Sequence, residues 1–168
     1  MRERTKLDAL LPRSTSVAVF VLTIACYDLA ITFLLGAIVR LSHLPPRPPS
    51  FWESHGDPMA HILEALVFAP LLESGLLFGI VELLRWLRAA TWLQVACAAV
   101  VVAAPHSFTW GWEPYAFIVA PSFAIQAASY LYWRTVSRKH GFAVVVCIHA
   151  LHNLLPTLSI IARVTSKT

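Results

Sequence analysis

The stretch GFAVVVCIHALHNLLP, residues 141–156, decides the fold of this chain. Most of its residues suit the interior of a bilayer, yet it also carries His149, His152 and Asn153. On a helix, His149 and Asn153 are four residues apart and therefore share a face. An unpaired polar group in hydrocarbon costs several kcal/mol, so we expect this face to meet polar groups from elsewhere in the chain.

The composition supports a membrane setting for the whole chain. Of its 168 residues, 58% are hydrophobic and 13% are charged, and the mean hydropathy is +0.67. A soluble domain is usually about 45–50% apolar and about 25% charged. The excess of apolar residues predicts an integral membrane protein of one domain, in contact with the lipid bilayer. The net charge of +4 comes from Arg and Lys between apolar runs, so we expect no nucleic-acid partner.

The apolar runs predict an all-α fold, a polytopic membrane helix bundle of about five spans. A bilayer core of roughly 30 Å needs about 20 residues of helix. The predicted spans are residues 14–39, 59–84, 90–106, 115–133 and 141–162, and the segment 105–114 is expected to end the third span. A basic leader at 1–13 and a proline-rich loop at 40–58 complete the single domain 1–168.

The distribution of Lys and Arg predicts the orientation of the spans. With the N-terminus inside, nine basic residues fall on the cytoplasmic side and four on the opposite side, which favours N-in and C-out. The nine are Arg2, Arg4, Lys6, Arg13, Arg85, Arg88, Arg134, Arg138 and Lys139, and the four are Arg40, Arg47, Arg163 and Lys167.

Several ionisable residues interrupt the predicted spans. Glu73 lies in the middle of the second span, where a carboxylate is costly unless it is hydrogen-bonded, neutralised or functional. Glu82 lies at the basic end of that span and is interpreted as interfacial. Asp28, in the first span, is interpreted as an interhelical partner or a residue facing a polar cavity. His106 lies at the far end of the third span.

Together, Glu73, His106, His149 and Asn153 suit peptide-bond hydrolysis by water. A carboxylate can take a proton from water while an imidazole orients or shares that proton. A second imidazole with an amide supplies hydrogen-bond donors for the oxyanion of a tetrahedral intermediate. This chemistry needs no covalent nucleophile, and it requires neither a cofactor nor a metal.

Three segments carrying these residues resemble the motifs of the CPBP family, the type II CAAX prenyl endopeptidases and their bacterial relatives, which are glutamic intramembrane proteases. APLLESGLLFG, residues 69–79, resembles the first motif, His106 the lone histidine of the second, and residues 149–153 the third. The resemblance covers residues of about 59–156. It implies that Glu73 activates water with help from His106, and that His149 and Asn153 form the oxyanion site. The catalytic spans are then those within about 59–162.

The chain departs from the family pattern at three positions, which places it in a divergent branch. Ser74 stands where the family has a second glutamate, Phe78 where it has an arginine, and Val102 where it has a phenylalanine. The resemblance implies a membrane-anchored protein or peptide as substrate, cut in its C-terminal region. The C-terminus could be prenylated or a sorting tail. The bacterial relatives imply location in the bacterial inner (plasma) membrane.

Two neighbours of these residues are expected to support the site without touching substrate. Ser74 can hydrogen-bond within its own helix. His152 points about 100° away from each adjacent residue on a helix. Two alternative functions stay open. One is a zinc-dependent protease that uses Glu73, His106, His149 and His152. The other is a non-catalytic accessory or immunity protein of the same fold.

Overall fold

The computed structural model describes residues 16–42, 57–110 and 114–165, apart from some side chains near the ends of these segments. The basic leader predicted at 1–13 and most of the loop predicted at 40–58 lie outside the described residues. The described chain is all helical, with α1 (Val17–Leu41), α3 (Pro58–Leu63), η2 (Glu64–Phe68), α4 (Ala69–Trp86), α5 (Thr91–Trp110), α6 (Pro114–Trp133) and α7 (Arg138–Thr165). The all-α prediction is confirmed.

Three helical segments of the described chain are long and apolar enough to cross a membrane. They are Val17–Leu41, Met59–Trp86 and Arg138–Ala162, and Thr91–Ser107 is a shorter apolar helix. The second of these combines α3, η2 and α4 into one continuous rod. Many large apolar side chains on these helices are exposed, as expected for surfaces that face lipid.

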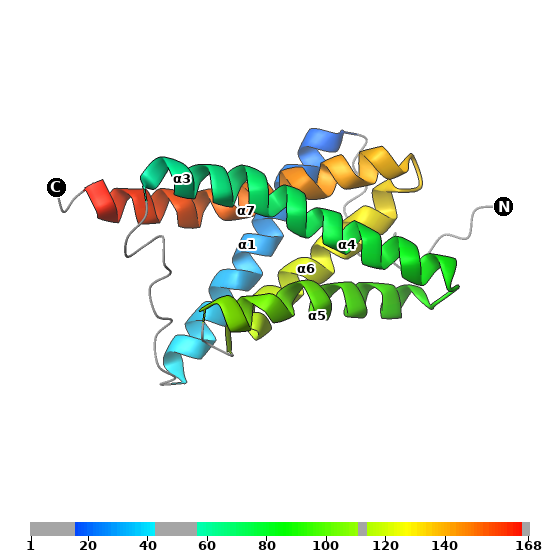
Figure 1. Cartoon of the computed structure of the whole chain (residues 1–168), viewed down its shortest axis with the longest axis horizontal. Helices are drawn as coiled ribbons and strands as arrows, with labels where there is room; N and C mark the ends of the chain where they lie inside the picture. Colours follow the sequence, from blue (N-terminus) through cyan, green and yellow to red (C-terminus); the bar gives the residue numbers. More distant parts are fainter. Residues whose placement is uncertain (1–15, 43–56, 111–113, 166–168) are drawn as a thin grey trace.

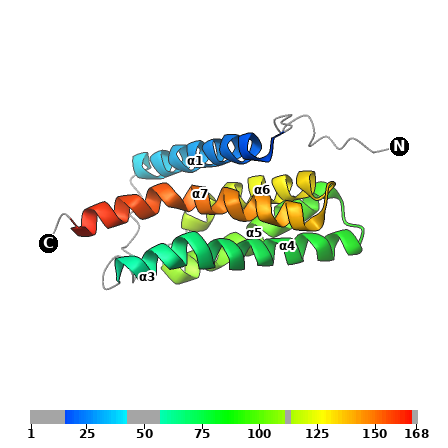
Figure 2. The same ribbon diagram turned by 90° about the horizontal axis from the view of Figure 1, so that it is seen from above.

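Helix α7 lies at the centre of the bundle. It contacts α1 on one side and α4, η2 and α3 on the other, and it also packs on α6. Figure 1 shows α1 and α6 crossing the direction of α4 and α7 obliquely. Figure 2 shows α1 as the outermost layer, with α7 between it and the α3–α4 rod. Residues on α7 can therefore face polar groups on either side.

Two apolar clusters fix these contacts. The larger joins α4, α5, α6 and one residue of α7 around Leu77, Val102 and Tyr130. The smaller joins α1 to α6 and α7, and there Phe20 stacks on Tyr132 with ring centroids 5.4 Å apart. Packing of these side chains holds α1 against α6 and α7.

The third helix ends within the segment 105–114 that was predicted to terminate it, and α5 continues through Pro105 to Trp110. A proline removes one backbone hydrogen bond, and helices in membrane proteins tolerate this because neighbouring groups can satisfy the freed carbonyl. The continuation keeps His106 on the regular helix, one turn after Val102.

Glu82 is the centre of an ion-pair cluster at one end of the bundle rather than a free interfacial group. The Tyr130 hydroxyl donates to its Oε1 at 2.7 Å, and Arg134 binds both of its oxygens through Nε and Nη2. Arg138 Nε lies 3.2 Å from Oε2. Charge-assisted bonds of this kind tie α4, α6 and the start of α7 together.

Gly141 lets α7 approach this end of α6 closely. A Cβ at residue 141 would lie 2.9 Å from Cδ2 of Tyr130 and 3.0 Å from its carbonyl oxygen. Real Cβ atoms rarely come this close, and the backbone oxygen cannot move aside as a flexible side chain can. Only glycine fits this contact without displacing α6.

We therefore expect Gly141→Ala to lower the free energy of unfolding by about 1–3 kcal/mol, the usual cost of overpacking. Gly79→Ala is the matched control, because a Cβ there has no atom within 4 Å. Unfolding of both variants in mixed micelles with increasing denaturing detergent measures the difference. Equal stability of the two variants would contradict this account of Gly141.

Candidate active site

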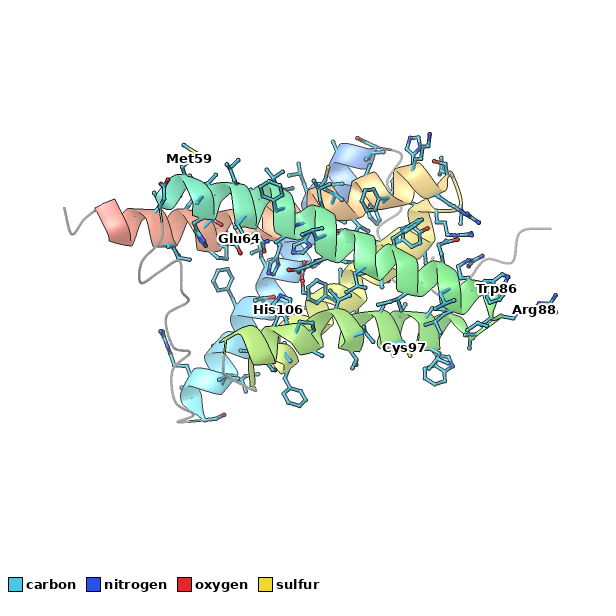
Figure 3. The ribbon with its side chains drawn as sticks, viewed as in Figure 1. Met59, Glu64, Trp86, Arg88, Cys97 and His106 are labelled. Carbon is cyan, nitrogen blue, oxygen red and sulfur yellow. The ribbon has the colours of Figure 1, made fainter. Side chains whose placement is uncertain are left out.

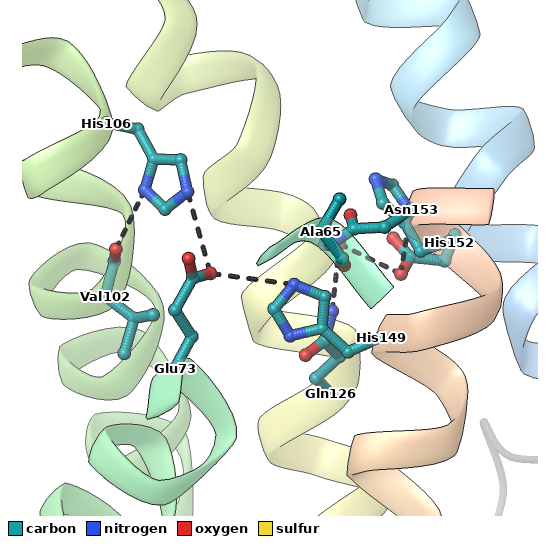
Figure 4. A network of polar contacts seen from close by, with 10 residues as sticks. Ala65, Glu73, Val102, His106, Gln126, His149, His152 and Asn153 are labelled. Carbon is teal, nitrogen blue, oxygen red and sulfur yellow. Dashed lines mark hydrogen bonds and ion pairs between the residues drawn. The ribbon is translucent and has the colours of Figure 1, made fainter. Parts of the chain in front are cut away.

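Two imidazoles from different helices reach one oxygen of Glu73. His106 Nε2 on α5 and His149 Nε2 on α7 each lie 3.6 Å from Glu73 Oε2 on α4. Figure 4 shows the carboxylate between the two rings, and Figure 3 places His106 on the C-terminal half of α5, facing α4. The side chains of Glu73, His106 and His149 are 27%, 18% and 5% exposed. The structure thus brings together three of the four residues predicted to carry the chemistry.

The contact of His106 with its own helix determines which ring nitrogen faces the carboxylate as an acceptor. Its Nδ1 lies 3.2 Å from the Val102 carbonyl oxygen. Since a carbonyl only accepts hydrogen bonds, this contact assigns the hydrogen of the neutral ring to Nδ1. Nε2 then directs a lone pair toward Glu73. Two facing acceptors must share a proton or a donor between them, which is the arrangement of an acid–base pair.

His149 has the opposite preference. Its Nδ1 is enclosed and has no hydrogen-bond partner among the described residues, while Nε2 faces Glu73. A hydrogen on Nε2 therefore has an acceptor within reach, whereas a hydrogen on Nδ1 has none. The ring can present an N–H group to the space beside the carboxylate.

Phe123 of α6 lies beside both imidazoles. Its ring centroid is 5.5 Å from that of His106 and 5.7 Å from that of His149, and its side chain is buried. The aromatic ring forms an apolar wall that holds both imidazoles in place. Sequence reasoning missed Phe123, because an aromatic residue in an apolar helix carries no distinguishing signal.

Asn153 does not contact Glu73 in the structure but binds the backbone of the neighbouring rod. Its Nδ2 donates to the Ala65 carbonyl oxygen at 2.8 Å. A primary amide has two N–H groups, so one remains for another acceptor. The structure thus gives Asn153 a backbone contact that sequence reasoning did not foresee.

The Ala65 carbonyl needs this donor because of the π-helix η2. The N–H of Ala69 donates to the Glu64 carbonyl, five residues back, so it does not reach Ala65. The next residue is Pro70, which has no N–H. Both backbone donors that would normally serve the Ala65 carbonyl are therefore lost, and the side chain of Asn153 takes their place. A π-turn of this kind often accompanies a functional site.

The two residues predicted to support the site lie on either side of it. Ser74 is 1% exposed and its Oγ has no hydrogen-bond partner among the described residues, so the expected bond within its own helix is not formed. His152 is turned toward α1, with Nδ1 3.2 Å from Asp28 Oδ2. Asp28 is fully buried between helices, in line with its interpretation as an interhelical partner.

Phe78, at the position of the family's arginine, packs edge-on against Tyr130 and Phe142, with centroids 5.5 and 6.0 Å away. The side chain therefore belongs to the apolar interior and adds no charge to the site.

The zinc alternative requires four side chains around one metal ion, and the structure does not bring all four together. They are Glu73, His106, His149 and His152. Glu73 contacts two of the histidines, but His152 faces Asp28 instead. Within the part of the chain that the structure describes, no group of three or more His, Cys, Asp or Glu side chains is arranged to hold a metal ion.

Comparisons with protein-family models, with curated proteins and with solved structures give no match for this chain. The fold therefore defines a class and not a family: an all-helical protein with three helices suited to span a membrane. The resemblance to CPBP proteases remains a prediction that rests on the three motifs.

The backbone contact of Asn153 predicts a compensating pair of substitutions. Asn153→Ala leaves the Ala65 carbonyl without a donor and should lower the free energy of unfolding by about 1–3 kcal/mol. Pro70→Ala supplies an N–H that can reach this carbonyl, so the double variant should regain most of the loss. The same detergent titration measures both variants. If the two effects simply add, the π-helix does not create the need for Asn153.

Proposed function

We propose that this protein is an intramembrane endopeptidase that hydrolyses a peptide bond in a membrane-anchored substrate. The observation that supports it is the approach of two imidazoles, from two other helices, to a single oxygen of Glu73. Placing a carboxylate and two imidazoles together in an apolar bundle is energetically costly, which supports a catalytic or ligand-binding role for them. The family resemblance of the same residues supports the same chemistry.

In the proposed reaction, a water molecule held between Glu73 and His106 attacks the carbonyl carbon of the scissile bond. Its proton passes to Glu73 Oε2 as the new C–O bond forms. The negative charge develops on the carbonyl oxygen, where the Nε2–H of His149 donates to it, and the second N–H of Asn153 is the further donor. Glu73 then gives the proton to the amide nitrogen, the C–N bond breaks, and the products are a carboxylic acid and an amine.

We also propose that the chain crosses the membrane five times, with its N-terminus in the cytoplasm, as a single domain in a bacterial inner membrane. The ion pairs of Glu82 with Arg134 and Arg138 support this topology. They gather the end of α4, the end of α6 and the start of α7 at one edge of the bundle. These are the ends that the positive-inside rule assigns to the cytoplasm.

The proposed substrate is the C-terminal region of a protein or peptide anchored in the same membrane. The apolar packing of Phe78 removes the cation that the family has at this position. A substrate that depends on that cation is therefore disfavoured, and a sorting tail fits better than a prenylated CAAX end.

Glu73→Gln should abolish cleavage while leaving the fold intact, because the amide has the same shape but cannot take a proton from water. Loss of a general base typically costs about 10²–10⁴-fold in rate. Mass spectrometry of membrane-protein C-termini in cells with the wild type or the variant measures the effect. Glu64→Gln is the matched control on the same rod, since Glu64 pairs with neither imidazole. Unchanged termini with normally expressed Glu73→Gln would favour the accessory or immunity protein.

The purified protein should keep its activity in the presence of strong zinc chelators. The reason is that His152, which a four-ligand zinc site would require, is held by Asp28. Cleavage of an identified substrate peptide, with and without chelator and after addition of zinc, measures this. Activity lost with chelator and restored by zinc would replace the glutamic mechanism with the zinc-dependent one.

A further inference from the structure

A second buried polar cluster lies on the opposite side of α7 from Glu73. Its centre is Asp28 of α1, whose side chain is 0% exposed. Ser122 Oγ on α6 donates to Asp28 Oδ2 at 2.9 Å, and Gln126 Nε2 donates to Ser122 Oγ at 3.2 Å. The cluster thus joins the outermost helix to α6 through side-chain contacts.

His152 connects this cluster to the turn of α7 that carries the proposed site. Its Nδ1 lies 3.2 Å from Asp28 Oδ2, and it is the one basic group in contact with that carboxylate among the described residues. Because a carboxylate oxygen accepts hydrogen bonds, this contact favours a ring hydrogen on Nδ1 of His152, directed at Asp28. The Nδ1 atom is enclosed, while the side chain as a whole keeps 11% exposure, so the edge of the ring that faces Asp28 is its buried edge.

The turn of α7 from residue 149 to 153 is therefore held by polar contacts from three directions. His149 faces Glu73 on α4, Asn153 binds the Ala65 carbonyl on η2, and His152 contacts Asp28 on α1. Figure 4 shows the contacts of His149 and Asn153 on this turn. A rotation of α7 about its axis would break all three contacts together, because the side chains are fixed to one helical turn.

Apolar packing alone does not set this rotation. In lipid, the neighbouring helices and the acyl chains are similarly apolar, so helix rotation is determined by close packing and by specific polar contacts. The apolar cluster of Phe20, Ile24 and Ile148 already holds α1 against α7. The buried polar pair adds a directional contact to this packing, so its geometry supports a role in orienting α7.

We infer that Asp28 is a positioning residue, which acts through His152 to hold His149 and Asn153 at the angle that the Glu73 site requires. This inference rests on the proposed hydrolysis at Glu73 for its catalytic consequence. The contact itself can be tested without any activity. It makes α1, which contributes no residue to the reacting atoms, a necessary part of the catalytic unit.

The test compares two substitutions of Asp28. Leucine is close in size but cannot contact His152. Asparagine can still accept from Ser122 and can donate an N–H to His152 Nδ1, which would move the ring hydrogen of His152 from Nδ1 to Nε2. Thr32→Val, one turn further along α1, is the matched control. Ring ¹⁵N signals of His149 and His152, recorded in bilayers, report the geometry and tautomer directly.

We expect Asp28→Leu to shift the His149 signals and to lower kcat by roughly 10- to 100-fold, the scale of a misplacement near 1 Å, with KM changed little. Asp28→Asn should keep most of the activity and the His149 signals while reversing the His152 tautomer. His152→Leu should shift the His149 signals in the same way but lower stability further, because it leaves Asp28 buried without its basic partner, and the double leucine variant should resemble Asp28→Leu. Thr32→Val should behave as the wild type.

Two results would overturn the inference. One is a folded Asp28→Leu protein whose His149 signals and kcat equal those of the wild type. The other is an Asp28→Asn protein as impaired as Asp28→Leu, which would show that charge rather than contact matters. If no Glu73-dependent cleavage is found, the proposed function fails, but the ¹⁵N signals of His149 in Asp28→Leu still decide whether Asp28 positions α7.

Discussion

The rest of the structure depends on the presence of a carboxylate within an apolar bundle. Glu73 can be accommodated there only if neighbouring helices turn polar groups toward it. His106 and His149 do so from α5 and α7, and this fixes the rotation of both helices about their axes. Apolar packing holds α4, α5 and α7 together, and the need to satisfy Glu73 selects among the helix rotations that apolar side chains alone would allow. The proposed function and the fold therefore depend on the same contacts.

The sequence predicted those features that depend on hydrophobic periodicity or on the free-energy cost of an unpaired polar group in the bilayer. Long apolar runs predicted the helices, and the spacing of His149 and Asn153 predicted a shared face. The convergence of Glu73 with His106 and His149 followed from the cost of leaving any of them unpaired in hydrocarbon. The sequence leaves the exact end of α5 within 105–114 open, because the effect of one proline depends on whether neighbouring groups can satisfy the freed carbonyl.

Other structural features depend on tertiary contacts that the local sequence does not determine. In the π-helix, the Ala69 N–H donates to the Glu64 carbonyl and not to the Ala65 carbonyl that it would reach in an α-helix. The contact of His152 with Asp28 depends on the angle at which α1 crosses α7, which is set by packing throughout the bundle. The role of Phe123 has no signal in a chain of which 58% is hydrophobic. Such details arise from tertiary contacts.

The two glutamates of α4 have contrasting partners, and the contrast bears on the role proposed for Glu73. Glu82 is bound by Arg134, Arg138 and the hydroxyl of Tyr130, all of which keep their donors at physiological pH. A carboxylate neutralised by permanent cations has no reason to accept a proton. Glu73, nine residues earlier, pairs with no Arg or Lys among the described residues; it faces two imidazoles, whose ring nitrogens can each donate or accept a hydrogen bond. Glu82 is thus a structural ion-pair partner at the end of α4. Glu73, in the middle of the helix, has partners that suit the proton transfer proposed for it.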